Sequence, residues 1–214
     1  IHYRAIAGAD RELASDDLLL LDSGGHYRNG TTDITRTIAI GTPPKGAVAA
    51  YSHVLQSHIH LAKVKFPAGT NGKQLDAIAR APLWAVGLDF AHGTGHGVGH
   101  VLSVHEGPAS ISKRGEVALE AGMVLSNEPG YYQTGDWGIR IENLIVVTPA
   151  KQSGFLEFET ITLCPFDRRL IDKMRLDASE IDWIDHYHRA VHKQLHPHLS
   201  PMAKSWLEAA CRPL

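Results

Sequence analysis

The first element that the sequence predicts is a hairpin near the start of the chain. An apolar run, LLLL, begins at Leu18, and a segment rich in threonine and isoleucine, TTDITRTIAI, begins at Thr31. The intervening HYRNG contains Asn-Gly, a pair typical of hairpin turns. We therefore predict two strands within residues 17–41, joined by a turn at residues 27–30.

Two helices follow this hairpin. Apolar residues recur at helical spacing from Thr42 to Phe66, with Thr42 as candidate N-cap and two prolines in the first turn. A second helical pattern spans residues 71–86, with Thr70 or Asn71 as its cap and a glycine just past its end.

The second half of the chain returns to strands and then to helices. Short apolar runs predict strands near 100–105, 123–128, 138–148 and 155–163. Amphipathic patterns follow, with Ser179 capping one helix and Ser200-Pro201 opening the last. The order of strands, helix pair and strands predicts an α+β domain over 1–163. Residues 164–214 are predicted to form a helical extension packed on this domain or on a second subunit.

The composition indicates an ordinary globular protein, with 43% hydrophobic and 21% charged residues. Because 21 Lys and Arg face 23 Asp and Glu without a basic stripe, we predict no nucleic-acid partner. Apolar runs are far shorter than the roughly 20 residues of a membrane span, so we predict no membrane segment. Cys164 and Cys211 have no metal or redox spacing, which favours a reducing, cytoplasmic location.

Residues 92–100, HGTGHGVGH, carry three histidines at intervals of four. Four glycines in nine residues would cost a helix about 3–4 kcal/mol relative to alanine, so we predict an extended segment. Alternation then places His92, His96 and His100 on one face. Residues four apart on a strand are roughly 13 Å apart, so the three histidines cannot share one metal ion unless the chain bends.

Asp22 and Asp33 lie on the two arms of the hairpin, and the turn decides how close they come. A two-residue turn would place Asp33 opposite His26, roughly 13 Å from Asp22. A four-residue loop would place Asp33 opposite Gly24, diagonal to Asp22 at roughly 7 Å. Only the second register lets the two carboxylates share a metal site, and the room left by the neighbouring glycines favours it.

Two further carboxylates stand near predicted strands. Glu128 lies in SNEPGYY at a strand end, and Glu142 lies in GIRIENLIVV inside an apolar strand, on the same face as Arg140. Charged groups in such a strand need a partner or a cation. Four carboxylates and one imidazole suit Mn²⁺, Zn²⁺ or Co²⁺, and the charge of four carboxylates balances two divalent ions. We therefore predict a site for two ions.

Four segments, LLLLDSGGHYRNGTTDITRT, HGTGHGVGHVLSVHEGP, SNEPGYY and GIRIEN, resemble in this order the motifs of the creatinase/aminopeptidase P family of pita-bread metallopeptidases. The remainder resembles the C-terminal extension of the large three-domain aminopeptidases P. The resemblance implies a pita-bread fold, a curved antiparallel sheet with flanking helices, here lacking its first strand and helices. The implied ligands of a dinuclear, usually manganese centre are Asp22, Asp33, His96, Glu128 and Glu142.

The resemblance further implies an Xaa-Pro aminopeptidase, which hydrolyses the bond between an N-terminal residue and a following proline with a hydroxide generated by the two ions. Glu128 is then the expected proton acceptor. His2, His92 and His105 match histidines that contact substrate, and His105 can donate a hydrogen bond to the oxyanion. Arg140 and Tyr132 are expected to hydrogen-bond to the ligands, whereas His100 has no expected role.

Two alternatives stay open from the sequence. The same chemistry serves Xaa-Pro dipeptidases (prolidases) and creatinase, and some pita-bread domains bind peptides without catalysis. Because the chain opens on IHYRA, we expect upstream domains of the same chain, where a targeting signal would lie, and we expect a homodimer. The histidines at 188, 192 and 196 have helical spacing, and we interpret them as a solvent-facing or subunit-facing stripe.

Overall fold

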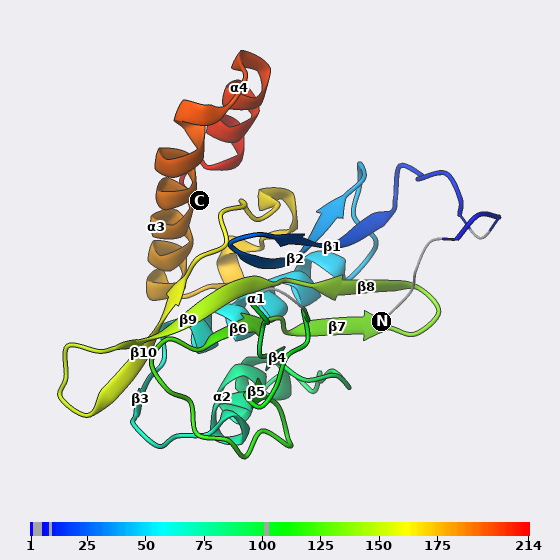
Figure 1. Cartoon of the computed structure of the whole chain (residues 1–214). Coiled ribbons are helices and arrows are strands. Elements are labelled where there is room, and N and C mark those ends of the chain that lie inside the picture. Colours follow the sequence, from blue (N-terminus) through cyan, green and yellow to red (C-terminus); the bar gives the residue numbers. More distant parts are fainter. Residues whose placement is uncertain (2–5, 9, 101–102) are drawn as a thin grey trace.

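The computed structural model describes residues 1, 6–8, 10–100 and 103–214. The first half of the chain contains these strands and helices in order: β1 (Leu18–Tyr27), β2 (Gly30–Ala39), α1 (Ala47–Lys63), β3 (Lys65–Pro67), α2 (Gly72–Trp84) and β4 (Gly95–His96). The second half contains β5 (Ser110–Ile111), β6 (Val124–Asn127), β7 (Gly130–Gln133), β8 (Trp137–Arg140), β9 (Asn143–Pro149), β10 (Phe155–Thr160), α3 (Ala178–Leu195) and α4 (Pro201–Ala210). The predicted α+β class is confirmed (Figure 1).

The hairpin β1–β2 adopts the second of the two predicted registers. Gly24 lies opposite Asp33, and Asp22 lies opposite Thr35. The ladder continues one pair beyond the prediction, to Tyr27 and Gly30, so that a two-residue turn closes it. Because side chains alternate between faces, Asp22, Asp33 and Thr35 lie on the same face of the hairpin.

The main sheet has the strand order β3-β10-β9-β6, and its pairs are antiparallel. The predicted single strand at 138–148 is wrong, because the chain divides it into β8 and β9. At the break, the Glu142 amide donates to the Thr35 carbonyl at 3.1 Å instead of continuing the β7–β8 ladder. The strands predicted at 123–128 and 155–163 are present as the slightly shorter β6 and β10.

The first helix is shorter than predicted at both ends. Its N-cap is Gly46, whose φ of 85° is left-handed, so Thr42 and the two prolines precede the helix rather than begin it. At the other end, Phe66 lies in β3, where it pairs with Leu156 of β10. Pairing with the sheet therefore replaces the last helical turn.

The second helix agrees with its prediction. Asn71, one of the two candidate caps, accepts from the Gln74 amide, and the Gln74 side chain accepts from the Asn71 amide in a capping box. The predicted glycine past the helix end, Gly87, has a φ of 76°. A reciprocal cap and a left-handed glycine are strong local signals, which explains why both ends of this helix could be predicted.

The strand predicted at 100–105 is absent from residues 100 and 103–105; residues 101 and 102 lie outside the described part. The glycine-rich segment bends instead of extending. The Gly97 amide donates to the Ala109 carbonyl, and the Gly97 carbonyl accepts from the Glu106 amide. The Gly99 amide donates to the Ser103 carbonyl at 2.7 Å. Of the extended segment predicted at 92–100, Gly95–His96 alone forms a strand, β4.

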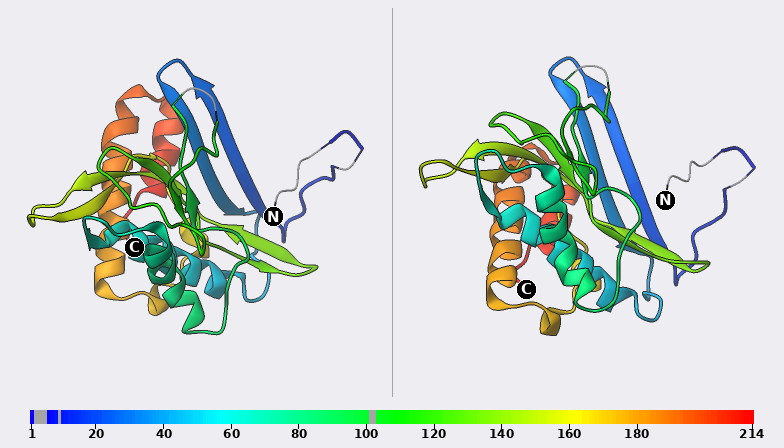
Figure 2. Two further views of the ribbon diagram at one scale, coloured as in Figure 1. Left: turned by 60° about the horizontal axis from the view of Figure 1, so that its bottom comes forward. Right: turned by 90° about the horizontal axis from the view of Figure 1, so that it is seen from below.

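The core consists of two clusters that meet at α1. One cluster joins α1 to the C-terminal helices through Tyr51, Leu55, Ile184, Val191 and Leu207. The other joins α1 and α2 to the main sheet through residues that include Leu61, Leu75, Ile111, Leu125 and Ile145. Figure 2 shows the hairpin β1–β2 along one side of the molecule and α3 toward the other side.

The C-terminal region packs on α1 within this chain, which is the first of the two arrangements predicted. The last helix begins at Pro201 after the predicted cap Ser200. The cap of α3, however, is Asp177 and not Ser179: Asp177 accepts from the Glu180 amide in a capping box. The predicted division of the chain at residue 163 stays a prediction.

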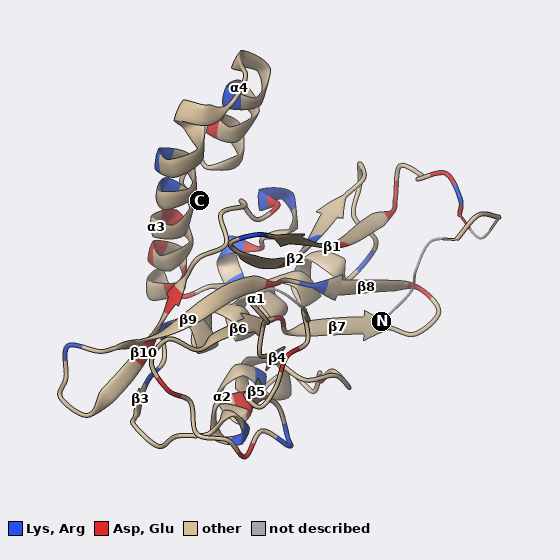
Figure 3. Ribbon diagram, viewed as in Figure 1, with Lys and Arg blue, Asp and Glu red and all other residues tan. Residues whose placement is uncertain are grey.

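Charged residues of both signs are interspersed along the ribbon, α3 and α4 included (Figure 3).

His188 does not belong to the predicted polar stripe. Its side chain is buried, and its Nε2 atom accepts from the Phe166 amide at 3.1 Å. None of the helices in the described part of the chain combines the length and the apolarity of a membrane span.

Candidate metal centre

The hairpin supplies the first two acidic side chains of the site. Asp33 is 7% exposed, whereas Asp22, at the open side of the hairpin, is exposed. A Cβ placed on Gly24 would lie 2.7 Å from the Thr32 carbonyl oxygen and 3.8 Å from Asp33 Oδ1. The glycine therefore leaves space directly beside the Asp33 carboxylate, as the sequence had suggested.

The glycines around His96 allow the chain to pass close to its neighbours. A Cβ at Gly95 would collide with the Ser126 carbonyl oxygen, and a Cβ at Gly97 would collide with that of Glu106. His96 Nδ1 lies 2.9 Å from the Gly97 carbonyl oxygen, which can only accept, so Nδ1 carries the hydrogen. Nε2 then points to the carboxylates, 3.4 Å from Asp33 Oδ2 and 3.2 Å from Glu128 Oε1.

Glu128 follows β6 and is held from two sides. Its amide donates to the Thr94 carbonyl at 2.7 Å, which ties it to the glycine-rich segment. Ser126 Oγ donates to Glu128 Oε1 at 3.0 Å and accepts from the His96 amide at 2.9 Å. One hydroxyl thus sets the position of two predicted ligands at once.

Glu142 lies at the break between β8 and β9, where the chain crosses the hairpin. Thr35 Oγ1 donates to Glu142 Oε2 at 2.7 Å, and both side chains are buried. The break, which the sequence did not predict, directs this carboxylate toward the same space as the hairpin aspartates.

Side chains with metal-ligating atoms meet here in overlapping groups. Within each group the donor atoms lie within 4.8 Å of one another. The groups are Asp22, Asp33 and Glu142; His96, Glu128 and Glu142; and Asp33, His96 and His105. The structure therefore brings together all five predicted ligands, which the sequence scatters over residues 22–142. A set of four carboxylates and one imidazole fits hard or borderline divalent ions.

The electrostatics of the cluster favour a cation. Burial and the charges of neighbouring carboxylates raise the pKa of Glu142, and burial raises the pKa of Glu128 against the opposing effect of His96. Burial lowers the pKa of His96, but the hydrogen bond to Asp33, the Gly97 carbonyl and the charge of Glu128 outweigh it, and the pKa rises to about 9. Without a metal ion, this cluster therefore retains protons that a divalent cation would displace.

Arg140 hydrogen-bonds to a predicted ligand, as expected, whereas the Tyr132 hydroxyl bonds to Arg140 and His92 beside the acidic cluster rather than to a ligand. Arg140 Nη2 donates to Asp22 Oδ2 at 2.6 Å, and Nη1 donates to the Tyr132 hydroxyl at 2.9 Å. The same hydroxyl lies 2.8 Å from His92 Nε2. A continuous chain of hydrogen bonds thus runs from His92 through Tyr132 and Arg140 to Asp22.

Two of the predicted substrate-contacting histidines line a cavity of about 1410 Å³. His92 and His105 line it together with the acidic cluster. The rings of His105 and His96 meet edge to face, with centroids 4.2 Å apart. The prediction for His2 lies outside the described residues. His100, to which we assigned no role, is exposed.

A buried arginine connects the site to the C-terminal region. Arg36 Nη1 donates to the Glu142 carbonyl at 2.6 Å, and Nη2 donates to the Cys164 carbonyl at 2.7 Å and the Tyr187 hydroxyl at 3.1 Å. The guanidinium also lies 4.7 Å from the centre of the Phe166 ring. Glu142 is therefore held by a residue that also fixes the segment leading to α3.

Three supporting residues, Thr35, Ser126 and Arg36, were not predicted from the sequence. Residues two apart on a strand share a face, which offers a sequence signal for Thr35 and Ser126. Thr35 lies two residues after Asp33, and Ser126 lies two residues before Glu128. Arg36 faces away from the acidic cluster on β2. Its hydrogen bonds to Glu142 and Cys164 reach segments more than a hundred residues away, which no local pattern indicates.

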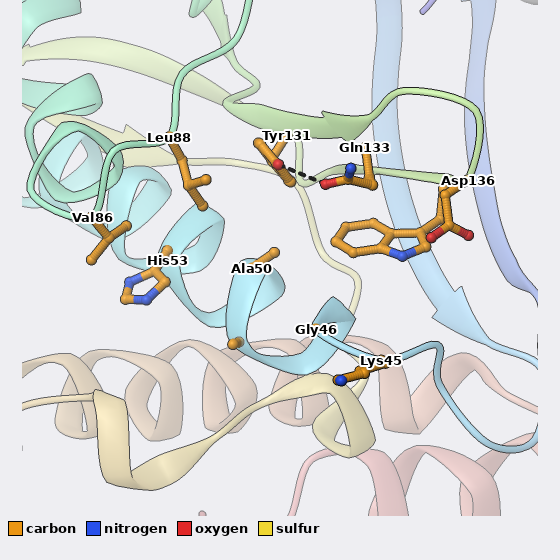
Figure 4. Close-up of a pocket in the computed structure, with 11 residues that line it drawn as sticks. Lys45, Gly46, Ala50, His53, Val86, Leu88, Tyr131, Gln133 and Asp136 are labelled. Carbon is orange, nitrogen blue, oxygen red and sulfur yellow. Dashed lines mark hydrogen bonds between the residues drawn. The ribbon is translucent and has the colours of Figure 1, made fainter.

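A second cavity, of about 360 Å³, lies between the start of α1 and the β7–β8 hairpin (Figure 4). Its walls are mixed, with Lys45 and His53 on the helix side and Leu88 and Tyr131 opposite. The Tyr131 hydroxyl donates to Gln133 Oε1 at 2.9 Å. None of these residues belongs to a metal-ligating group found within the described ranges. The chemistry is therefore concentrated in the larger cavity.

Comparison with known proteins agrees with this geometry. Residues 1–149 match the model of metallopeptidase family M24, and residues 154–214 match that of the C-terminal region of peptidase M24. The chain belongs to metallopeptidase family M24. Aminopeptidase P1 of Lotus japonicus is 46% identical over the whole chain, which covers 34% of that protein. For the Xaa-Pro aminopeptidase of Caenorhabditis elegans the values are 44% and 36%. The M24 chain thus spans about a third of the length of the curated relatives it matches.

Solved M24-like structures extend the comparison. The crystal structure of X-prolyl aminopeptidase from Caenorhabditis elegans, described as a cytosolic enzyme with a dinuclear active site, matches all of this chain and 36% of its own, with a TM-score of 0.94 and 44% identity. Dipeptidase PepE of Mycobacterium ulcerans matches 74% of this chain and 41% of its own, with a TM-score of 0.65 and 36% identity. The predicted pita-bread fold and family resemblance are confirmed.

Proposed function

We propose that this chain is the catalytic part of a metal-dependent Xaa-Pro aminopeptidase. The observation that carries the proposal is the convergence of five donor side chains on one cavity in overlapping groups. The proposed ligands are Asp22, Asp33, His96, Glu128 and Glu142, and the proposed ions are two Mn²⁺. Two divalent ions held there would polarise the scissile carbonyl and lower the pKa of a water molecule.

The side chains around the cluster supply the remaining roles in this proposal. Glu128 is the proton acceptor, since burial has raised the proton affinity of its carboxylate. His105 lines the cavity beside His96, where an imidazole N–H can donate to a developing oxyanion. His92, whose Nε2 atom meets the Tyr132 hydroxyl, contacts the substrate, and His2 is proposed to do the same.

The substrate proposal is a peptide with proline in second position. A proline nitrogen has no hydrogen to donate, so recognition depends on shape and apolar contact. Leu18 and Leu20, which lie on the same face of β1 as Asp22, line the cavity together with Trp137, and they supply such an apolar wall. The C-terminal region favours aminopeptidase over dipeptidase, because the dipeptidase PepE match covers 74% of the chain and the X-prolyl aminopeptidase match covers all of it.

Three further statements belong to the same proposal. The protein acts in the cytoplasm, as the Caenorhabditis elegans relative is described to do. It functions with upstream domains of its own chain, because the relatives are about three times as long as this segment. It forms a homodimer, a state that gel filtration with light scattering would test.

The activity is tested with the full-length protein by comparing hydrolysis of the tripeptide Arg-Pro-Pro with that of the dipeptide Gly-Pro. We expect release of arginine from the tripeptide, loss of activity on chelation and recovery on addition of Mn²⁺. Activity on the dipeptide alone would identify a prolidase instead. Undiminished hydrolysis after complete metal removal would contradict the metal mechanism, and absence of hydrolysis with both ions bound would favour a peptide-binding role.

A further inference from the structure

A second group of metal-ligating side chains lies on the C-terminal helices. His192 is on the last turn of α3, His196 immediately follows that helix, and Glu208 is on α4. His196 Nε2 lies 3.1 Å from Glu208 Oε1, and the two imidazole rings have centroids 4.8 Å apart. Outside the candidate metal centre, this is the one such group found among the described residues. The sequence suggested no carboxylate here, since Glu208 is twelve residues beyond His196.

The spacing and chemistry of this group suit one transition-metal ion. Histidines four residues apart on a helix present their rings on one face, as they do in helical zinc motifs. Donor atoms about 2.0–2.2 Å from a tetrahedral zinc ion lie roughly 3.3–3.6 Å from one another. The three donor atoms here already lie within 4.8 Å, so modest side-chain rotation closes the site. Two imidazoles and one carboxylate are a borderline set, which selects Zn²⁺ over the hard ions favoured by four carboxylates.

We propose that His192, His196 and Glu208 bind one Zn²⁺ ion and that this ion ties α4 to α3. Of the last helix, Leu207 is buried while Met202 and Trp206 are exposed, and past its end the Leu214 amide donates to Asp185 Oδ1 of α3 at 2.9 Å. An ion with ligands on both helices would add a direct link between α4 and the C-terminal end of α3, beside which α4 lies (Figure 1). This site does not depend on the proposed peptidase function.

The proposal is tested with the full-length protein carrying Asp33→Asn to weaken the candidate metal centre. Zinc equivalents are counted by titration against a chromophoric chelator. We expect His192→Gln, His196→Gln and Glu208→Gln each to lose one equivalent relative to the Asp33→Asn parent. Glu208→Gln keeps a carbonyl oxygen that can accept from His196, so it removes the anionic ligand with little change in packing. His186→Gln and His198→Gln, which change exposed histidines nearby, are the matched controls and keep the equivalent.

Hydrogen exchange provides the second readout. Zinc is expected to slow amide exchange over residues 201–210 in the parent and in the two control variants. The same addition leaves exchange in His196→Gln unchanged. Equal zinc equivalents in His196→Gln and His198→Gln would overturn the site. Loss of the equivalent without any effect of zinc on exchange in α4 would overturn the proposed link between the helices.

Discussion

The molecule contains two groups of histidine and acidic side chains whose donor atoms are alike and whose surroundings differ. In the central cavity, the Asp33 side chain is 8% exposed and that of Glu128 is 16% exposed. On the C-terminal helices, Glu208 is 57% exposed. Burial raises the pKa of Glu128 and Glu142, so without a metal ion these carboxyl groups keep protons that lower the charge of the central group. The comparison teaches that burial obliges the central group to hold either protons or metal ions, whereas solvent screens the charge of the exposed group with or without an ion.

The largest expected effect comes from removing one charge of the central group. In Glu142→Gln of the full-length protein, hydrolysis of Arg-Pro-Pro is expected to fall about 10³-fold, because a metal ligand contributes several kcal/mol to the transition state. The matched control is Glu157→Gln, which alters a partly exposed ion pair with Lys65. Activity of Glu142→Gln within a few-fold of that of Glu157→Gln would contradict the role of Glu142.

A smaller effect is expected from a hydroxyl that positions two ligands. Ser126→Ala removes the donor to Glu128 Oε1 and the acceptor of the His96 amide. Loss of such support costs about 10–100-fold in metal affinity, which competition with a chelator measures. Ser205→Ala, at an exposed position of α4, is the control. Equal metal affinity in both variants would show that Ser126 does not position the ligands.

The pH dependence of stability separates metal-free from metal-loaded protein. Glu128, Glu142 and His96 have raised pKa values in the folded protein. Between their ordinary and raised pKa values, the folded state binds more protons than the unfolded state, so stability falls as pH rises. The metal-free protein is therefore expected to have a lower melting temperature at pH 8 than at pH 6. Metal ions that displace these protons reduce that dependence, which thermal unfolding at both pH values measures. A metal-free protein that gains stability over this range would contradict the assignment.

The hydrogen bond between Arg36, beside the central group, and Tyr187 of α3 predicts a moderate effect on stability. Tyr187→Phe removes a hydroxyl that accepts from Arg36 and lies 2.9 Å from the Cys164 carbonyl. Loss of one buried hydrogen-bonding group costs about 1–2 kcal/mol, measured by urea unfolding of the metal-loaded protein. An unchanged free energy of unfolding would show that this network adds nothing to the packing of α3.

The smallest effect is expected in the exposed group. In metal-free protein, Glu208→Gln is expected to change the free energy of unfolding by less than about 1 kcal/mol, as for other exposed ion pairs. Denaturant titration measures it, with Glu157→Gln as a comparison. A loss as large as that expected for Tyr187→Phe would show that burial does not separate the two groups.

The local elements could be predicted wherever their signals lie close together in the sequence. The register of β1–β2 followed from Asp22, Asp33 and the glycine between them, and the ends of α2 followed from Asn71 and Gly87. The break at Glu142 could not be predicted. There the Glu142 amide donates to the carbonyl of Thr35, more than a hundred residues away, instead of continuing the β7–β8 ladder.

The candidate site shows the same division. Its five proposed ligands could be named, because they lie in motifs with a family resemblance. The side chains that support them were missed in part, because Thr35 and Arg36 act through contacts over long distances in the sequence. The grouping of Glu208 with His192 and His196 depends on how α4 folds back on α3, which periodicity alone does not indicate.

The most direct test of the account is anomalous diffraction from crystals of the full-length protein soaked in Mn²⁺, recorded at a wavelength where manganese scatters. The account predicts two peaks in the central cavity, both surrounded by the side chains of Asp22, Asp33, His96, Glu128 and Glu142. Absence of manganese density among these five side chains at saturating Mn²⁺ would contradict it.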